Sequence, residues 1–453
     1  MTFRPISQRE FEIYALSLPT GPDYDPENFD SAWISENTHA VGALLKPEEK
    51  GYDYIVMRRQ VDHRFVPTVV RNGPWSRESA EAELKAAMRP DDAQEPLSPG
   101  VKRRPLLLGP SDKEAGGNFK LLTETIQHRP ALYTVGEVYL AMPRPDDNFV
   151  PDFRTNNFDS RLWELYLVAA FREQGVYISQ DQVSPDFLIE RGDDQAYVEA
   201  VTANPQGQRL QGFTTPVFAP EDRSERLIGA PAVRFAKTLR SKLQRRYEDK
   251  SHVKGKPFAL AIADFHAPGS MTWSREALPS YLYGTNAVVR QDKFGPIAVG
   301  EKIAVLLGDE QIPAGLFRDP AMSHISAVIF SNSATLGKFN RMGFLAGWRP
   351  PGLKMIRHGI LFDRTPGALE PIPFEHDVLS DDYAKLWPSG EAWCQELEVY
   401  HNPLAEYPLS FNLAPGATHW FEADGEVQCL TRWEWSVLAS VTHLLFKPEK
   451  KAK

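Results

Sequence analysis

The chain has very little cysteine and no long apolar segment, and both absences narrow its class. Its 453 residues include only two cysteines, Cys394 and Cys429, which excludes a disulfide framework and any cysteine-rich zinc site. No apolar run approaches the roughly 18 residues that a membrane-spanning helix needs. The first residues, MTFRPISQREFEIYAL, carry charges throughout and lack the apolar core of a signal peptide. We therefore expect a soluble, cytoplasmic protein with no membrane partner.

Motifs of several common enzyme classes are also missing, and positive charge is scarce. The sequence contains no Walker loop, dinucleotide-binding glycine motif, His-Glu-x-x-His helix or nucleophile elbow. Its 51 Lys and Arg stand against 60 Asp and Glu, which gives a net charge of −9. Between residues 223 and 256, however, the sequence has eleven Lys and Arg but only three Asp and Glu. That stretch is compatible with phosphate binding, although taken alone it is more simply a solvated helix surface.

Composition and patterning predict three regions. Domains typically hold roughly 100–200 residues, so a chain of this length should contain two or three. Residues 1–100 predict an N-terminal α+β domain of unknown role, with strands at 54–57 and 65–70, a helix at 76–88 and a linker at 90–100. Residues 111–350 hold the predicted core. Residues 351–453, rich in proline and aromatic residues, predict an irregular C-terminal extension with one late helix near 433–445.

The order of elements between residues 118 and 265 predicts an α/β (α+β) core. Helices are expected at 118–127, 160–174 and 234–247, the second capped near Asp159 or Ser160 and ended by Gly175. Short strands are expected at 176–179, 186–190, 196–202 and 258–265, with a hairpin turn at 191–194. A further core strand is expected at 325–330. This alternation predicts a mixed central sheet flanked by helices.

Three acidic residues in this core stand alone among apolar neighbours. Glu164 is the only charge in a run of ten residues, 162–171, and Glu199 is the only charge in 196–201. Asp186 opens a strand directly after Pro185. A helix that is apolar nearly all round is buried, so the Glu164 carboxylate needs a partner, for which Arg161 and a bound cation are both candidates. The hairpin would bring Asp186 and Glu199 together, where two carboxylates repel unless a proton or cation lies between them.

These residues give the segment a resemblance to the PD-(D/E)xK, or restriction-endonuclease-like, superfamily. The matching pieces are Glu164 in the first helix, Pro185-Asp186 at a strand start, and Glu199 thirteen residues later in the next strand. The resemblance covers about residues 155–265. It implies a restriction-endonuclease-like fold in which the three acids bind Mg²⁺ (or Mn²⁺), helped by a main-chain carbonyl beside the second acid. It also implies a divalent-metal-dependent nuclease that hydrolyses nucleic-acid phosphodiester bonds in defence or repair.

The sequence departs from this family at one catalytic position. The family places a lysine two residues after the second acid, where this chain has Val201. Some members carry that lysine on the following helix, which here offers Lys242, the preferred candidate because it lies in the middle of the helix, and Lys237. The candidate catalytic residues are therefore Asp186, Glu199, Lys242 and Lys237. The missing lysine equally allows a catalytically inactive protein on the same fold, which binds nucleic acid or a protein partner.

The basic helix also supplies the candidate contacts to a nucleic-acid backbone. These are Arg234, Arg240, Arg245 and Arg246. Close to Glu199, polar side chains that could hold substrate or water by hydrogen bonds follow at Thr202, Asn204 and Gln206, and His266 could line the same site. Turn chemistry explains Asn204-Pro205 equally well, and a lone histidine after a strand, such as His266, is more often structural. The choice between DNA and RNA and the oligomeric state, a homodimer included, are open at this point.

Overall fold

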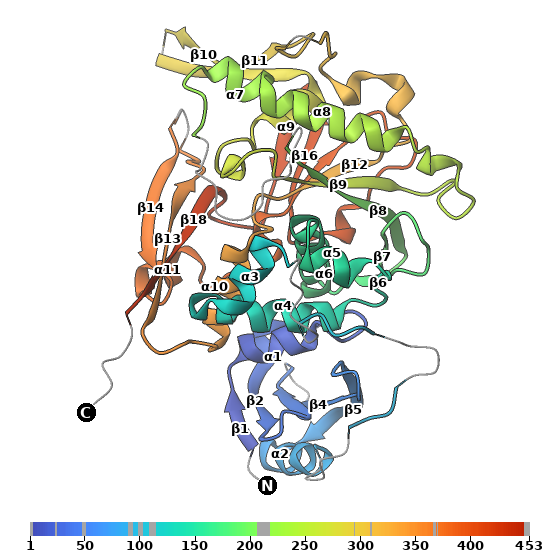
Figure 1. Cartoon of the computed structure of the whole chain (residues 1–453), viewed down its shortest axis with the longest axis vertical. Coiled ribbons are helices and arrows are strands. Elements are labelled where there is room, and N and C mark those ends of the chain that lie inside the picture. Colours follow the sequence, from blue (N-terminus) through green and yellow to red (C-terminus); the bar gives the residue numbers. More distant parts are fainter. Residues whose placement is uncertain are drawn as a thin grey trace.

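The computed structural model describes residues 3–22, 25–47, 51–88, 94–97, 103–107, 115–205, 218–293, 295–308, 310–365, 368 and 370–447. Gln206 and most of the predicted linker lie outside these residues. The chain is a mixed α+β protein in which several sheets are combined with helices (Figure 1). Within the described residues, no helix is both long and apolar enough to cross a bilayer.

The N-terminal region forms an antiparallel sheet at one end of the molecule (Figure 1). Its order is β1 (Phe3–Ile6), β2 (Phe29–Ser35), β3 (Ala40–Leu45), β4 (Tyr52–Arg59) and β5 (Phe65–Trp75). Helix α1 (Gln8–Ala15) packs between this sheet and the rest of the chain, and α2 (Arg77–Ala87) packs on β3 and β4. The Ser76 side chain accepts a hydrogen bond from the Ser79 amide, so the predicted N-cap of α2 is present.

The central sheet contains eight strands in the order β17-β16-β15-β12-β9-β8-β7-β6. It is mixed, because β8, β9 and β12 run parallel whereas β6, β7 and β8 form antiparallel pairs. The tight turn between β7 and β8 contains Gly192 at φ +59°, a conformation that glycine adopts at little cost. The strands are β6 (Tyr177–Ser179), β7 (Phe187–Arg191), β8 (Asp194–Ala203), β9 (Phe258–Asp264), β12 (Ala327–Phe330), β15 (Glu398–His401), β16 (Thr418–Ala423) and β17 (Glu426–Leu430).

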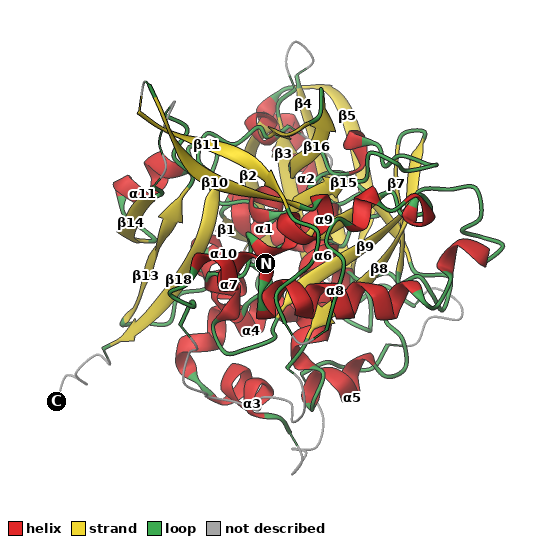
Figure 2. Ribbon diagram, turned by 90° about the horizontal axis from the view of Figure 1, so that it is seen from above, coloured by secondary structure: helices red, strands yellow, loops and turns green. Residues whose placement is uncertain are grey.

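Helices cover both faces of this sheet because its central strands are apolar on both sides. Every residue of β9 is buried, as expected for a strand between two helical layers. Along β8, Ala196 and Val198 join the core beneath α6 (Phe158–Glu173), and Tyr197 and Val201 join the core beneath α8 (Ala230–Leu243). Figure 2 shows α8 lying across β8 and β9. The two predicted helices that flank the hairpin are therefore held on opposite faces of the sheet.

The start of α6 differs slightly from the prediction. The helix begins at Phe158, its N-cap is Asn157 rather than Asp159 or Ser160, and the Asn157 side chain makes no capping bond. The remaining helices are α3 (Gly117–Glu124), α4 (Arg129–Ala141), α5 (Phe149–Arg154), α7 (Arg223–Ile228), α9 (Ala277–Tyr283), α10 (Leu336–Ala346) and α11 (Asp381–Leu386). Strands β10 (Thr285–Asp292) and β11 (Gly295–Lys302) form a separate hairpin.

The C-terminal region is not irregular, and this prediction was wrong. Strands β13 (Leu353–Leu361), β14 (Ile372–Asp377) and β18 (Val437–Phe446) form a sheet of their own. Strands β15, β16 and β17 extend the central sheet, so a domain boundary at residue 350 would leave these strands outside it. The helix predicted near 433–445 is also wrong, because β18 pairs with β13 along its whole length. Pairing with a distant strand overrides a local pattern that carried no strict alternation.

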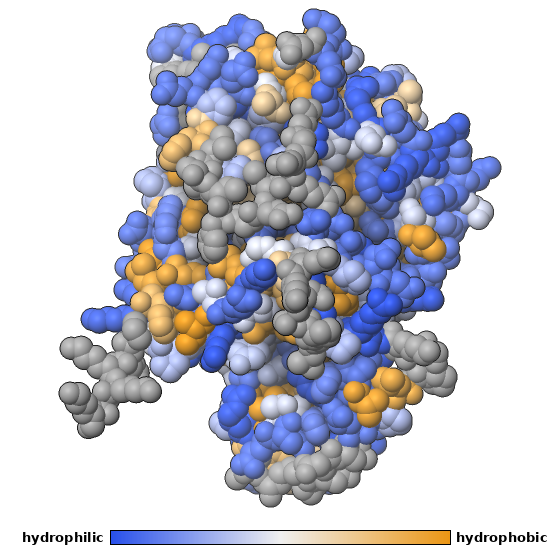
Figure 3. Space-filling model, viewed as in Figure 1, coloured by the Kyte–Doolittle hydropathy of each residue, from blue (hydrophilic) through white to orange (hydrophobic). Residues whose placement is uncertain are grey.

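The surface of the C-terminal sheet is more apolar than its surroundings. Figure 3 shows a mostly hydrophilic face on which apolar side chains gather over this sheet. The exposed side chains there include Val441 and Leu445 of β18 and Phe362, which directly follows β13. One face of the three-stranded sheet is thus only partly covered by the described chain.

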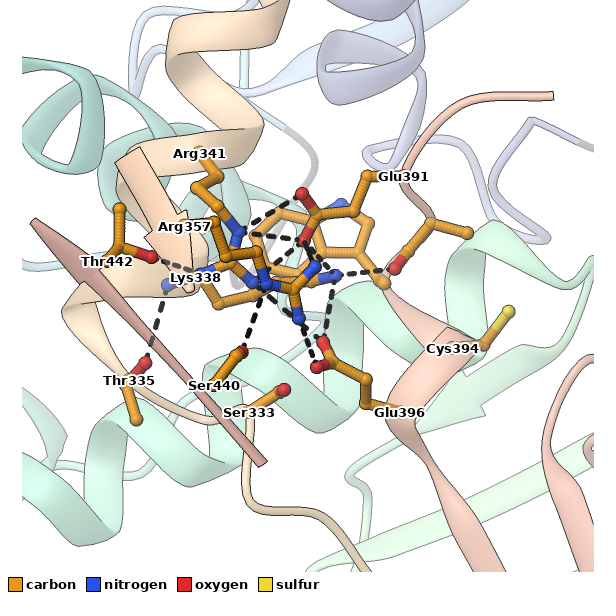
Figure 4. Close-up of polar contacts among 12 residues, drawn as sticks. Ser333, Thr335, Lys338, Arg341, Arg357, Glu391, Cys394, Glu396, Ser440 and Thr442 are labelled. Carbon is orange, nitrogen blue, oxygen red and sulfur yellow. Dashed lines mark hydrogen bonds and ion pairs between the residues drawn. The ribbon is translucent and has the colours of Figure 1, made fainter. Parts of the chain in front are cut away.

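A buried ion network fixes the other face of this sheet to the core (Figure 4). Lys338 and Arg341 of α10 both bind Glu391, with Nζ···Oε1 and Nη2···Oε1 distances of 2.8 Å. Arg357 of β13 donates to Glu396 and lies 3.6 Å from Glu391. Burial alone would raise the pKa of Glu391, but the three cations hold that pKa well below its usual range. Neutral donors and acceptors complete the network, namely Tyr383, Ser440 and Thr442.

The network gives a test of the packing of the C-terminal region. Glu391→Gln should lower the free energy of unfolding by about 3–5 kcal/mol, because it leaves buried cations without their main partner. Chemical denaturation followed by fluorescence measures the change. Asp382→Asn is the control, since it breaks only the exposed ion pair between Asp382 and Lys385 and should leave the midpoint unchanged. Equal midpoints for parent and Glu391→Gln would contradict the network's stabilising role.

Candidate functional site

A cleft of about 670 Å³ opens between α6, α8 and the C-terminal half of β8. Its walls are strongly polar and carry charges of both signs. The acids are Asp152, Glu164 and Asp186, and the cations are Arg161, Arg234, Lys237, Lys242 and Arg245. The cleft therefore contains two of the three acids that the sequence singled out, and Glu199 lies buried at its edge.

The hairpin brings Asp186, which directly precedes β7, close to Glu199 of β8. Phe187 of β7 pairs with Val198 of β8, so Asp186, one residue before, comes opposite Glu199. Asp186 Oδ2 accepts a hydrogen bond of 2.7 Å from the Ala200 amide, which fixes this carboxylate at the end of β7. The Glu199 side chain points to the α8 face of the sheet, and the residue is only 3% exposed. This is the juxtaposition that the predicted turn at 191–194 implies.

Glu164 reaches the same cleft from α6. Arg161, one helical turn earlier, donates to Glu164 Oε1 at 3.0 Å. The same guanidinium binds Asp146 and Asp152, each at 2.7 Å. Arg161 is thus the partner that a buried glutamate on this helix requires, and it ties α6 to the loop before α5 and to α5 itself.

Burial and a neighbouring carboxylate make Glu164 and Asp186 each an unusually weak acid. Burial, with a further contribution from Asp186, raises the pKa of Glu164 to about 8, although Arg161 opposes the shift. Burial, followed by the Glu199 carboxylate, raises the pKa of Asp186 to about 7, against the Ala200 amide and Lys242. Near neutral pH such a pair holds a proton between its members or accepts a cation in its place. Strongly shifted acids in a cleft mark it as a functional-site candidate.

The two candidate lysines of α8 have different partners. Lys242 Nζ binds Glu199 Oε1 at 2.7 Å. Lys237 Nζ binds the exposed Glu310 at 2.8 Å. Residues five apart on a helix point in different directions, yet both lysines line the cleft. Of the two, only Lys242 bonds to one of the predicted acids. Val201, where the family pattern has its lysine, is buried in the apolar core beneath α8.

The four arginines proposed to contact a nucleic-acid backbone also differ in where their side chains lie. Arg234 and Arg245 line the cleft. Arg240 does not, and its Nε donates to the Tyr281 hydroxyl at 3.1 Å. Arg246 follows the helix in a left-handed conformation, and its Nε binds Asp249 at 2.7 Å. Only two of the four therefore face the space in which the acids lie.

A row of hydroxyl and amide groups continues the wall of the cleft. Ser160 Oγ and Thr202 Oγ1 share a hydrogen bond of 2.7 Å, and Asn204 Nδ2 donates to Thr202 Oγ1 at 3.0 Å. Ser160, Asp152 and Asp146 were not predicted as site residues. The acids of the loop sequence MPRPDDNFVPDF were the available signal, because Arg161 needs carboxylate partners. His266 does not line the cleft, and its Nδ1 bonds to Asp264 Oδ1 at 2.7 Å.

The oxygen donors of this cleft suit a hard divalent cation, which prefers carboxylate and carbonyl ligands. The Asp186 carboxylate raises the pKa of Glu164, and the Glu199 carboxylate raises the pKa of Asp186, as unscreened neighbouring carboxylates do. Within the described ranges, however, no group of three or more His, Cys, Asp and Glu side chains comes together in a metal-ligating arrangement. Lys242 holds Glu199 and Arg161 holds Glu164, so a cation would have to compete with these ion pairs.

Comparisons of the chain with protein-family models, with curated proteins and with solved structures found no match. No family is therefore established for it by these means. The functional assignment rests on the residues of the cleft and on the pattern that connects them.

The raised pKa of Asp186 predicts how stability depends on pH without metal. An acid whose pKa is higher in the folded state stabilises the fold below its unfolded pKa, and this stabilisation is lost as pH rises through the folded value of about 7. In EDTA, the parent should therefore lose stability between pH 5 and pH 8. Asp186→Asn, which can still accept from the Ala200 amide, should flatten this slope and unfold at a midpoint equal to or above that of the parent at pH 8.

Chemical denaturation at the two pH values measures the effect. Asp193→Asn removes an exposed carboxylate from the turn of the same hairpin and should keep the slope of the parent. If stability falls with pH as steeply in Asp186→Asn as in the parent, or more steeply, the pKa of the Asp186 carboxyl is not raised by the fold.

Proposed function

We propose that the chain is a divalent-metal-dependent nuclease that hydrolyses nucleic-acid phosphodiester bonds on a restriction-endonuclease-like core. The observation that carries the proposal is the 2.7 Å contact between Lys242 Nζ and Glu199, beside Asp186 in a cationic cleft. The family pattern has a lysine close to its second acid. In this chain β8 has Val201 at that position, and a lysine of α8 contacts the second acid instead. The order α6, β6, β7, β8, α8 and β9 also agrees with that pattern.

Each group in the cleft has a role in this proposal. Glu164, Asp186 and Glu199 would hold Mg²⁺ or Mn²⁺, whose chemistry when bound is to stabilise charge on a phosphoryl oxygen and to activate water. The Lys242 ammonium would donate a hydrogen bond to the attacking water and so orient it. Arg161 would keep Glu164 in position on α6. Binding of the cation and the substrate would break the Lys242–Glu199 ion pair, and the loss of this pair would offset part of their binding free energy.

The charge around the acids suits a phosphate backbone in spite of the net charge of −9. Arg234, Lys237 and Arg245 line the wall of the cleft formed by α8 and its end. Neutralisation of phosphates by such residues releases condensed counterions and is the main source of sequence-independent affinity. Both DNA and RNA present this charge. A role in defence against foreign nucleic acid or in repair belongs to the same proposal.

A second function is favoured by one specific observation. Glu199 and Glu164 are each satisfied by a cation of the chain itself, Lys242 and Arg161. Such ion pairs are also what a catalytically inactive protein would keep, since they offset the burial of the acids. In this case the cleft would bind nucleic acid without cutting it, or the chain would act through a protein partner. Lysine substitutions separate the two functions.

Lys242→Ala should reduce turnover by roughly 10²–10⁴-fold, the usual contribution of a positioned proton-transfer or water-orienting group. Its affinity for nucleic acid should stay close to that of the parent, and the slope of affinity against salt should fall by at most about one phosphate equivalent. Cleavage of labelled oligonucleotides at saturating substrate, with binding measured separately in EDTA, gives both quantities.

Lys237→Ala is the matched control, because it removes a lysine of the same helix that binds Glu310 rather than Glu199. It should keep the turnover of the parent. If both variants keep full turnover, α8 does not supply the missing lysine. If turnover holds in Lys242→Ala while affinity falls, Lys242 is only a backbone contact. A parent that binds nucleic acid but cleaves none of it favours the inactive binder.

A further inference from the structure

We infer that the cleft contains a second, distal phosphate subsite centred on Arg234, so that its substrate is a polynucleotide that extends several nucleotides beyond the reacting phosphate. This inference rests on the proposed function, because it assumes that the acids mark the position of that phosphate. Among the cations that line the α8 wall of the cleft, it assigns to Arg234 the phosphate most distant from the acids.

Arg234 is a cation of the cleft for which the described part of the chain supplies no ion-pair partner. Its Nε is buried and has no hydrogen-bond partner within the described residues. Its guanidinium forms no ion pair with a described acid, whereas Arg161, Lys237 and Lys242 are each bound to carboxylates. Arg245 also forms no ion pair with a described acid, but its side chain is exposed to solvent, whereas Arg234 is partly buried. Burial lowers the pKa of Arg234, against the attraction of Asp264. A partly buried cation without an ion-pair partner costs free energy, and an anion that enters the cleft would reduce this cost.

Asp264 is the nearest candidate partner, but its oxygens are engaged elsewhere. Its Oδ1 accepts from the amide of His266 at 3.0 Å and from His266 Nδ1 at 2.7 Å. Its Oδ2 accepts from Ser274 Oγ at 2.5 Å. The Asp264 side chain is fully buried, so these bonds hold it at the end of β9. It therefore attracts Arg234 without binding it, and the guanidinium remains available to a ligand.

Two independent measures place Arg234 well away from the acids. Lys242, which binds Glu199, lies eight residues along α8 from Arg234, or about 12 Å at 1.5 Å per residue. Asp264 pairs with Ala203, four residues along β8 from Glu199, or about 13 Å at 3.3 Å per residue. The phosphates of one strand of a B-form duplex follow at about 3.4 Å along the axis. Arg234 thus lies roughly three to four nucleotides from the reacting phosphate.

Several hydroxyl and amide groups lie along the cleft, in addition to its charged residues. Thr202 and Ser160 form a hydrogen-bonded pair on the β8 and α6 side, and Asn204 extends it. Thr238 and Ser241 line the same cleft from α8. These groups can donate to the phosphates and sugars between the two ends. A mononucleotide would leave most of this wall and Arg234 unused, whereas a polynucleotide would occupy both.

Oligonucleotides of different length test the inference directly. Fluorescein-labelled DNA and RNA of three and twelve nucleotides are titrated with protein in EDTA, and affinity is read from anisotropy. The parent should bind the twelve-mers much more tightly than the trimers. Arg234→Gln should weaken twelve-mer binding roughly tenfold and reduce its salt slope by about one, while trimer binding changes less than twofold. Arg234→Lys, which keeps the charge, should restore most of the loss.

Arg290→Gln is the control, because it removes an exposed cation of β10 that pairs with Glu301 outside the cleft. It should leave both affinities unchanged. Equal weakening of trimer and twelve-mer in Arg234→Gln, or no weakening of either, would overturn the distal subsite. Thermal midpoints of both Arg234 variants identify a folding defect.

Cleavage of the same twelve-mers with Mg²⁺ separates this inference from the proposed function. If the parent cleaves them but Arg234→Gln shows no length-selective loss, the distal subsite fails and the nuclease stands. If the selective loss is seen but no cleavage occurs, Arg234 is a subsite of a binding protein and the nuclease fails. A parent that binds none of the oligonucleotides overturns both.

Discussion

The burial of three carboxylates, two from the β7–β8 hairpin and one from α6, is the constraint on which the cleft depends. Glu199 is only 3% exposed, and burial raises the pKa of both Glu164 and Asp186. The Asp186 carboxylate further opposes ionisation of Glu164, and the Glu199 carboxylate opposes ionisation of Asp186. Such an arrangement persists only if cations or hydrogen-bond donors meet the acids at short range. Arg161 and Lys242 provide the cations, and the Ala200 amide provides the donor. Helices must therefore approach the hairpin from both faces.

The apolar parts of the fold make that approach possible. Strand β9 is buried on both sides, which allows α6 to pack on one face of the sheet and α8 on the other. Trp163 of α6 is anchored to the sheet by a hydrogen bond of 3.0 Å from its Nε1 to the Ala261 carbonyl. The polar ends of the two helices then meet across the C-terminal half of β8. The same principle operates at the C-terminal sheet, where buried ions are matched across α10 and β13.

Local patterns were sufficient to predict the elements that carry the site. The apolar run around Glu164, the turn at 191–194 and the uniformly apolar β9 each have a period or length that determines the element. The sequence also predicted that α8 would offer a lysine to the site, with Lys242 ahead of Lys237. It could not predict which of the α8 arginines face the cleft, because that depends on how Tyr281 and Asp249 position them.

Long-range pairing explains the predictions that were wrong. The segment 437–446 has no strict alternation, and it becomes β18 because β13 supplies a partner from about 80 residues away in the sequence. Strands β15, β16 and β17 are short, so the sequence pattern within each of them does not reveal that they belong to the central sheet. That Arg234 has no ion-pair partner among the described residues is likewise not evident from the sequence, since it depends on the bonds that His266 and Ser274 make to Asp264.

The most direct test of the central claim is a cleavage assay on mixed DNA and RNA substrates, single- and double-stranded, with Mg²⁺, with Mn²⁺ and with EDTA. Cleavage by the parent should require a divalent ion and should be lost in Glu199→Gln, whose thermal midpoint shows that it is folded. Cleavage that persists in EDTA or in folded Glu199→Gln would contradict the claim that these acids form the active site. A parent that cleaves no substrate with either ion would contradict the nuclease itself.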